Sequence, residues 1–139
     1  MSTPPRSAAG SPDDWLRRAK SNLLRAQQSK PDEVLWEDLC FDAQQAVEKA
    51  LKALLTFHAV PYRFTHDIAA LLTAVEQAAI EIPVSVRAAT ILTDYAVSTR
   101  YPGTAEPVTE ADCIAAVTIA TATVHWVEQR LKQYEVVSE

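Results

Sequence analysis

The chain has 139 residues, of which 48 % are apolar, and this length suits one domain with a real core. Its formal net charge of −5 argues against non-specific binding of duplex nucleic acid, which needs clustered Lys and Arg, but leaves room for a local basic pocket. Only two glycines occur, which argues against a β-rich fold with many tight turns.

Residues 1–10 are small, Pro-rich and without a core pattern, so we expect a disordered tail. A first helix is predicted after it, with Ser11 as N-cap and Pro12 at the first helical position, fading near Ser29. Its predicted core stripe consists of Trp15, Leu16, Ala19, Leu23, Leu24 and Ala26.

The second predicted helix, at about residues 32–58, is the longest and carries the widest apolar stripe, so we expect it to be central. That stripe includes Leu35, Leu39, Ala43, Ala46, Val47, Ala50, Leu51, Leu54 and Leu55. Glu48 and Lys52 stand four residues apart in the favourable order for an ion pair. An acidic and amide row follows this helix: Asp42, Gln45, Glu48 and Lys49, of which Asp42, Gln45 and Lys49 share one helical face. The row could support a site but is predicted to be solvated surface.

Three further helices are predicted from the breakers and caps that follow. The third starts at the N-cap Thr65 and runs through Ala79, and the fourth covers about residues 84–98. The last starts at a capping box of Thr109 with Asp112 and frays after Tyr134. Their predicted inner positions include Ile68, Leu71, Leu72, Val75, Ala88, Ile91, Leu92, Tyr95, Ala96, Ile114, Val117, Ala120, Val124, Val127 and Leu131.

These five helices predict an all-α fold, an up-and-down antiparallel bundle of four to five helices within residues 11–135. Cys40 and Cys113 are expected to be buried small hydrophobes, since two isolated cysteines make neither a zinc site nor a disulfide framework. With no signal-peptide pattern and no membrane-length apolar run, we expect a cytoplasmic protein that needs no membrane, metal or cofactor.

Two polar features stand out, each with two interpretations. Thr65-His66-Asp67 either contributes an imidazole and helix-start amides to a phosphate site, or caps a helix and closes the loop onto the bundle. Arg100-Tyr101, with Tyr95 upstream, either offers a guanidinium and a stacking ring, or satisfies helix carbonyls before the stop at Pro102. Spacing alone favours the structural interpretation of both.

The string from Phe41 to Leu55, FDAQQAVEKALKALL, resembles the signature of the HEPN family, the higher eukaryotes and prokaryotes nucleotide-binding domain. Three further pieces resemble the other segments of the family in the right order: Trp15-Leu16 with Ala19, Thr65-His66-Asp67-Ile68, and Ser98 to Gly103. The resemblance therefore covers residues 13 to about 134. It implies a compact helical bundle, often a homodimer, often found beside a small nucleotidyltransferase in prokaryotic toxin–antitoxin or defence modules.

Many HEPN members are metal-independent RNA-cleaving toxins whose motif is an Arg, four to six residues, then a His. This chain departs from that motif, since Arg100 has no His until His125 and Arg63 precedes His66 by only two intervening residues. We therefore do not assign ribonuclease activity or catalytic residues from the resemblance.

The sequence thus predicts a non-catalytic binding module for a nucleotide or nucleic-acid phosphate, or for a nucleotidyltransferase partner. The alternatives are a divergent HEPN endoribonuclease, using His66 and Arg100, and a purely structural dimerisation partner. Because His66 starts the third helix and Arg100 follows the fourth, we expect both at one end of the bundle. The candidate binding residues are His66, Arg100, Tyr101, Tyr62, Thr65 and Asp67.

Overall fold

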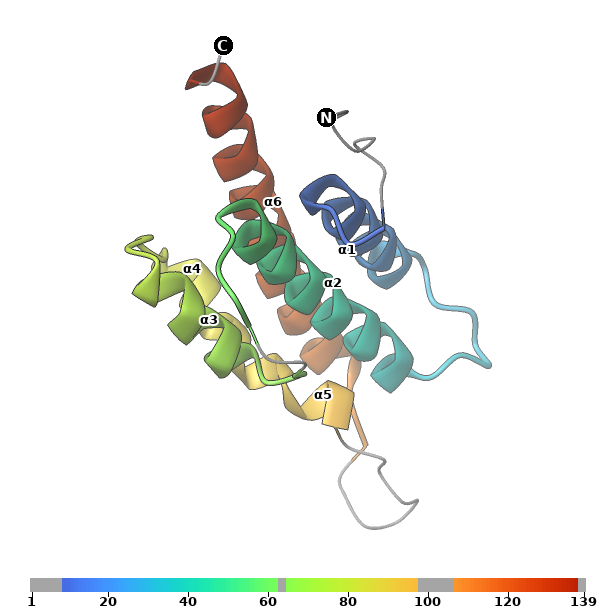
Figure 1. Ribbon diagram of the computed structural model, residues 1–139. Coiled ribbons are helices and arrows are strands. Elements are labelled where there is room, and N and C mark those ends of the chain that lie inside the picture. The colour runs from blue at the N-terminus through green and yellow to red at the C-terminus, as the bar shows by residue number, and fades with distance from the viewer. Residues whose placement is uncertain (1–8, 63–64, 98–106, 138–139) are drawn as a thin grey trace.

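The computed structural model describes residues 9–62, 65–97 and 107–137, and every regular element within these ranges is a helix (Figure 1). The elements are α1 (Pro12–Gln27), α2 (Trp36–Phe57), α3 (Ile68–Gln77), α4 (Val84–Arg87), the 3-10 helix η1 (Ala88–Leu92), α5 (Asp94–Val97) and α6 (Glu110–Val137). The predicted all-α bundle is confirmed. Among the described residues, no helix is both long and apolar enough to cross a membrane. The predicted tail at residues 1–10 lies almost wholly outside these ranges.

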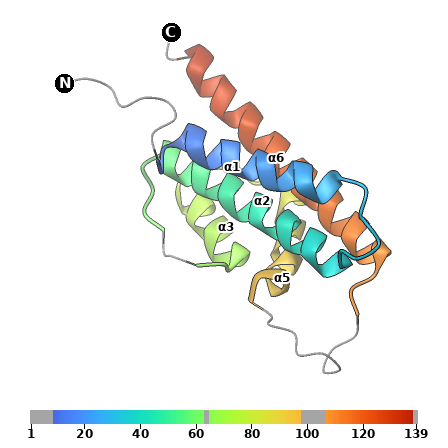
Figure 2. The same ribbon diagram turned by 90° about the vertical axis from the view of Figure 1, so that its right-hand side faces the viewer.

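Helix α2 is the centre of the bundle, as its wide apolar stripe predicts. It packs against α1, α3, η1, α5 and α6. Figures 1 and 2 show α1 lying along α2 in the opposite direction, with α6 behind the pair. Small residues at Ala43, Ala46, Ala50 and Ala53 are completely buried on α2 and let the neighbouring helices approach closely.

Helix α3 begins beside the middle of α2 and runs in the same direction, as both views show. The short helices α4, η1 and α5 then lead back toward the start of α3. There the backbone N–H of Ile68 donates to the hydroxyl of Thr93 at 3.2 Å. The predicted arrangement, in which the start of the third helix meets the end of the fourth, is thereby supported as far as Thr93.

Two predicted helix starts are confirmed by their caps. The hydroxyl of Ser11 accepts from the backbone N–H of Asp14 at 3.1 Å, and Pro12 occupies the first turn of α1. Thr109 and Asp112 form a reciprocal capping box before α6, with backbone-to-side-chain bonds of 3.0 and 3.1 Å. Cys40 and Cys113 are buried free thiols, as expected.

The predicted start of the third helix is wrong by two residues, because the N-cap is Asp67 rather than Thr65. The Asp67 carboxylate accepts from the backbone N–H of Ala69 at 3.0 Å, while the Thr65 hydroxyl accepts from the N–H of Asp67 itself at 2.9 Å. Both side chains accept hydrogen bonds from backbone N–H groups. The Asp67 carboxylate is the one at the N-terminus of α3, where the helix dipole favours an acidic side chain.

Two predicted helix boundaries also differ from the structure. Residues 32–35 form a turn in which the N–H of Val34 donates to the carbonyl of Pro31 at 3.0 Å, so α2 starts only at Trp36. The predicted helix over residues 84–98 is broken into α4, η1 and α5. Thr90, Ile91 and Thr93 are β-branched and disfavour regular α-helix, which fits the tighter 3-10 turns found there.

Five predicted inner residues are exposed instead: Leu24, Leu35, Ala88, Ile91 and Ile114. Leu35 precedes α2 and is not on its packed face. The three-residue period of η1 turns Ala89 and Leu92 inward and leaves Ala88 and Ile91 outside. At the other two positions the neighbours fill the core, since Cys113 is buried next to Ile114 and Leu23 packs against the core next to Leu24.

Candidate functional site

A row of buried polar side chains runs along the side of α2 that faces the start of α3. Gln44, Glu48 and Lys52 occupy successive turns of the helix, and all three are buried. Lys52 Nζ lies 3.0 Å from one Glu48 carboxylate oxygen, and Gln44 Nε2 donates to the other at 3.1 Å. The favourable spacing of Glu48 and Lys52 therefore produces an ion pair inside the protein rather than on its surface.

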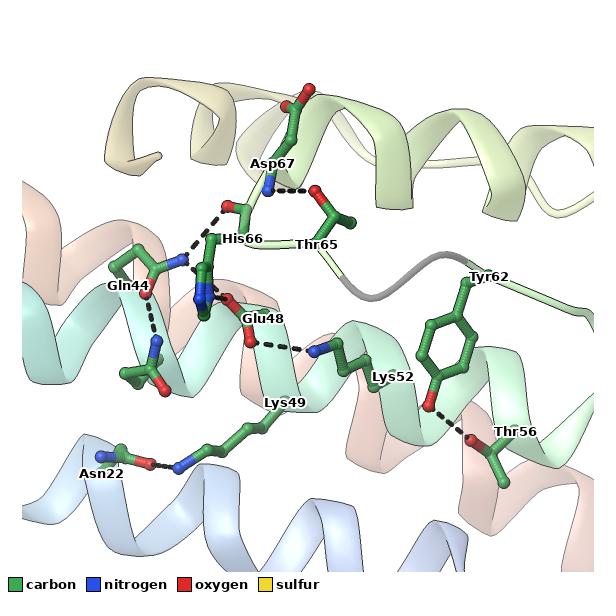
Figure 3. Close-up of polar contacts among 11 residues, drawn as sticks. Asn22, Gln44, Glu48, Lys49, Lys52, Thr56, Tyr62, Thr65, His66 and Asp67 are labelled. Carbon is green, nitrogen blue, oxygen red and sulfur yellow. Dashed lines mark hydrogen bonds and ion pairs between the residues drawn. The ribbon is translucent and has the colours of Figure 1, made fainter. Parts of the chain in front are cut away.

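His66 joins this row from the segment that precedes α3 (Figure 3). Its Nδ1 atom lies 2.7 Å from the Glu48 oxygen that Gln44 also contacts. The Gln44 amide donates in addition to the backbone carbonyl of His66 at 3.4 Å. The His66 side chain is 58 % exposed, whereas that of Glu48 is 4 % exposed, so the imidazole covers the buried carboxylate and keeps contact with solvent.

The surroundings of Glu48 hold it in its ionised form. Burial raises the pKa of this carboxyl, but hydrogen bonds from His66, Lys52 and Gln44 outweigh the burial and leave the pKa below its ordinary value. An ionised carboxylate only accepts hydrogen bonds, so the proton in the His66 contact lies on Nδ1. The second ring nitrogen, Nε2, is thereby left as an acceptor when the ring is neutral and as a donor when it is protonated.

Tyr62 belongs to the same network but lies beside Lys52 rather than beside His66 (Figure 3). Lys52 Nζ is 6.0 Å from the centroid of the Tyr62 ring and 5.4 Å from that of Trp15. The Tyr62 hydroxyl is 3.4 Å from that of Thr56. These rings enclose the Lys52 ammonium and complete its low-dielectric surroundings.

Thr65 and Asp67 fix the backbone on either side of His66. Their side-chain bonds to the N–H groups of Asp67 and Ala69 use up donors at the start of α3, and Thr93 takes the N–H of Ile68. These three amides are therefore already bonded inside the protein. An anion beside His66 would have to be bound mainly by side chains, and the His66 imidazole is a described group that faces outward there.

Arg100 and Tyr101 lie outside the described residues, so their predicted proximity to His66 stays a prediction. Tyr95 is described and is half-buried against the core. Within the part of the chain that the structure describes, no group of three or more His, Cys, Asp or Glu side chains is arranged to hold a metal ion.

The acidic and amide row on α2 was predicted to be solvated surface, and this is wrong for Asp42 and Glu48, which are both buried. Asp42 accepts from Asn22 Nδ2 of α1 at 3.0 Å, and Glu48 lies under His66. One feature of the sequence is consistent with the burial of Glu48. Glu48 and Lys52 are charged residues in a stretch where Val47, Ala50, Leu51 and Ala53 follow an apolar pattern, as expected of charges on a helix with neighbours on several sides.

A family model described as the HEPN domain matches residues 12–130. The solved crystal structure of an archaeal HEPN homologue is similar to this chain with a TM-score of 0.69 and 29 % sequence identity, covering 86 % of this chain and 97 % of the homologue. A search of curated proteins gave no match. The family match covers α1 to α5 and most of α6, including the segment around His66, and the chain therefore belongs to the HEPN family.

Proposed function

We propose that this HEPN-family protein is a non-catalytic binding module that recognises the phosphate group of a nucleotide or nucleic acid at His66. The observation that carries the proposal is the half-exposed imidazole whose Nδ1 is held at 2.7 Å by the buried Glu48 carboxylate. This contact fixes the ring and directs Nε2 away from the carboxylate. A protonated ring in this position donates to a phosphate oxygen.

The carboxylate beneath His66 does not repel such a ligand strongly, because its charge is already compensated. Lys52 pairs with Glu48 at 3.0 Å, and both side chains are buried. We expect Arg100 to add a guanidinium beside His66, with Tyr101 as a ring on which a base can stack. Tyr62 lies beside Lys52 instead and is not part of this site. Thr65 and Asp67 would act by fixing the loop that carries His66.

Binding can be tested by following the ring nitrogens of the histidines by NMR during titration with AMP and ATP. We expect the Nε2 resonance of His66 to shift and to saturate. His125, which is exposed on α6, serves as the internal control and should not shift. The variants His66→Ala and His125→Ala test which histidine binds the nucleotide, since only His66→Ala should abolish binding. Shifts that avoid His66 would refute the proposal.

A divergent ribonuclease is the second candidate, and the carboxylate–imidazole pair favours it. In general acid–base catalysis a carboxylate often holds the catalytic imidazole in place, and Glu48 contacts His66 in this way. In such an enzyme His66 would transfer a proton, and Arg100 would stabilise the negative charge of the phosphorane. Growth arrest on expression, together with cleavage of RNA that is lost in Arg100→Ala, would support this function over binding alone.

We also propose that the protein works as a homodimer and pairs with a nucleotidyltransferase of a toxin–antitoxin or defence module, as membership of the HEPN family suggests. Light scattering at micromolar concentration should then give twice the chain mass of 15.3 kDa. A dimer that binds neither nucleotide nor RNA would favour the purely structural alternative. A nucleotidyltransferase gene beside this one would favour pairing with a nucleotidyltransferase in a toxin–antitoxin or defence module.

A further inference from the structure

The imidazole of His66 is held from one side only (Figure 3). Its Nδ1 atom lies 2.7 Å from the Glu48 carboxylate, and no other side chain in the described part of the chain bonds to the ring. The Glu48 side chain is almost completely buried, whereas more than half of the His66 side chain is exposed. The part of the ring that faces solvent is therefore the edge away from the carboxylate, which carries Nε2.

The contact with Glu48 gives Nε2 the properties of a nucleophile. The ionised carboxylate can only accept a hydrogen bond, so the ring proton lies on Nδ1 and the lone pair of the neutral ring lies on Nε2. When Nε2 forms a covalent bond, positive charge develops on the ring. The hydrogen bond from Nδ1 to Glu48 stabilises that charge, as a carboxylate does for the imidazolium of a catalytic triad. An imidazole held in this way is suited to attack an electrophile.

The groups around His66 are engaged in bonds within the protein. The Lys52 amine is buried in its ion pair and enclosed by aromatic rings, so it does not compete as a nucleophile. The N–H groups of Asp67, Ile68 and Ala69 each donate to a side chain. These amides are therefore not free to hold a phosphate by contact alone, whereas a covalent bond from phosphorus to Nε2 needs no further donor.

We propose that His66 is a phosphorylation site, which accepts a phosphoryl group on Nε2 from a small donor with a phosphorus–nitrogen bond, such as phosphoramidate. The Nε2 lone pair forms the new bond to phosphorus, and the phosphorus–nitrogen bond of the donor breaks. The donor nitrogen is protonated beforehand and leaves with the bonding electron pair as a neutral amine. The ring keeps its Nδ1 proton and becomes positively charged, and Glu48 acts as the positioning residue.

The test is incubation of the full chain with potassium phosphoramidate, followed by mass spectrometry of its peptides at alkaline pH, where the new phosphorus–nitrogen bond is stable. His66 should be modified about tenfold faster than His125, which is exposed on α6 and has no described side chain bonded to its ring. Phosphorus NMR should place the group on Nε2 of His66, because Nδ1 is occupied by the bond to Glu48. His125 presents both nitrogens and should react at either.

Glu48→Gln should slow the modification of His66 to about the rate of His125. Because this variant leaves Lys52 as a buried cation without its partner, a second variant combines Glu48→Gln with Lys52→Met and carries neither buried charge. It should show the same loss. Glu76→Gln is the matched control, since it removes an exposed carboxylate from another ion pair, and it should leave the rate at His66 unchanged. Circular dichroism identifies the variants that are folded.

The proposal is overturned if His66 of the wild type reacts no faster than His125, or if the phosphoryl group is found on Nδ1 of His66. It is equally overturned if a folded variant without the Glu48 carboxylate reacts at the rate of the wild type. Phosphorylation goes beyond the proposed binding function, because it needs no nucleotide. A His66 that binds AMP but is not phosphorylated refutes phosphorylation alone, and a His66 that is phosphorylated but does not respond to AMP refutes nucleotide binding alone.

Discussion

The Glu48 carboxylate and the His66 imidazole are 18 residues apart in the sequence, yet their side chains meet at 2.7 Å. One is buried on the central helix, and the other is largely exposed on the segment that precedes α3. The contact therefore ties a surface loop to the interior of the bundle. It also fixes which imidazole nitrogen is available to a ligand.

Replacing Glu48 by Gln should destabilise the protein by about 3 kcal/mol, because Lys52 would then be a buried cation without its partner. Urea unfolding followed by circular dichroism measures this change. Glu76→Gln is the control, since the Arg87–Glu76 pair is exposed and its loss should cost less than about 1 kcal/mol. Equal effects of the two variants would contradict the buried network.

Stability should fall on the acid side partly through Glu48. Its pKa in the folded protein lies below its ordinary value, so the unfolded chain binds the proton first as pH falls. The contribution of Glu48 is complete above about pH 5 and is lost as pH drops through the folded-state pKa. Urea midpoints at pH 6 and pH 3.5 should therefore differ less in Glu48→Gln than in the wild type. An unchanged difference would show that other carboxyl groups account for it.

Asp67→Ala should cost about 1 kcal/mol, because Asp67 is the N-cap of α3 and its carboxylate accepts from the N–H of Ala69. Thr65→Ala should cost less, since the Thr65 hydroxyl bonds only the N–H of Asp67 outside the helix. Thermal unfolding of the two variants compares them directly. The reverse order would restore Thr65 as the helix cap.

Cys40 should react very slowly with a thiol-specific disulfide reagent in the folded protein. Burial raises its pKa to about 12, with a further contribution from the neighbouring Cys113, so the reactive thiolate is almost absent at neutral pH. We expect both cysteines to be labelled rapidly in denaturant and slowly in buffer. Fast labelling of the native protein would mean that the interface between α2 and α6 opens readily.

Most of the helical framework could be predicted from the sequence, because it depends on local patterns. The apolar stripe of α2, the Ser11 cap and the Thr109–Asp112 capping box are each defined by residues within a few positions of one another. The predictions failed where local helix preference is weak and packing decides the geometry. Ile91 is exposed and residues 84–97 form short helical pieces, because their geometry is set by contacts with α3 and α6.

The sequence alone also indicated that His66 starts the third helix region, and it carried the family resemblance. It could not show that Glu48 and Asp42 are buried, since a charged residue on a helix is usually solvated. Only the tertiary structure decided this, by laying α1 against one side of α2 and the loop before α3 against another. Burial and the pairing of distant residues arise from several segments at once, so local periodicity does not encode them.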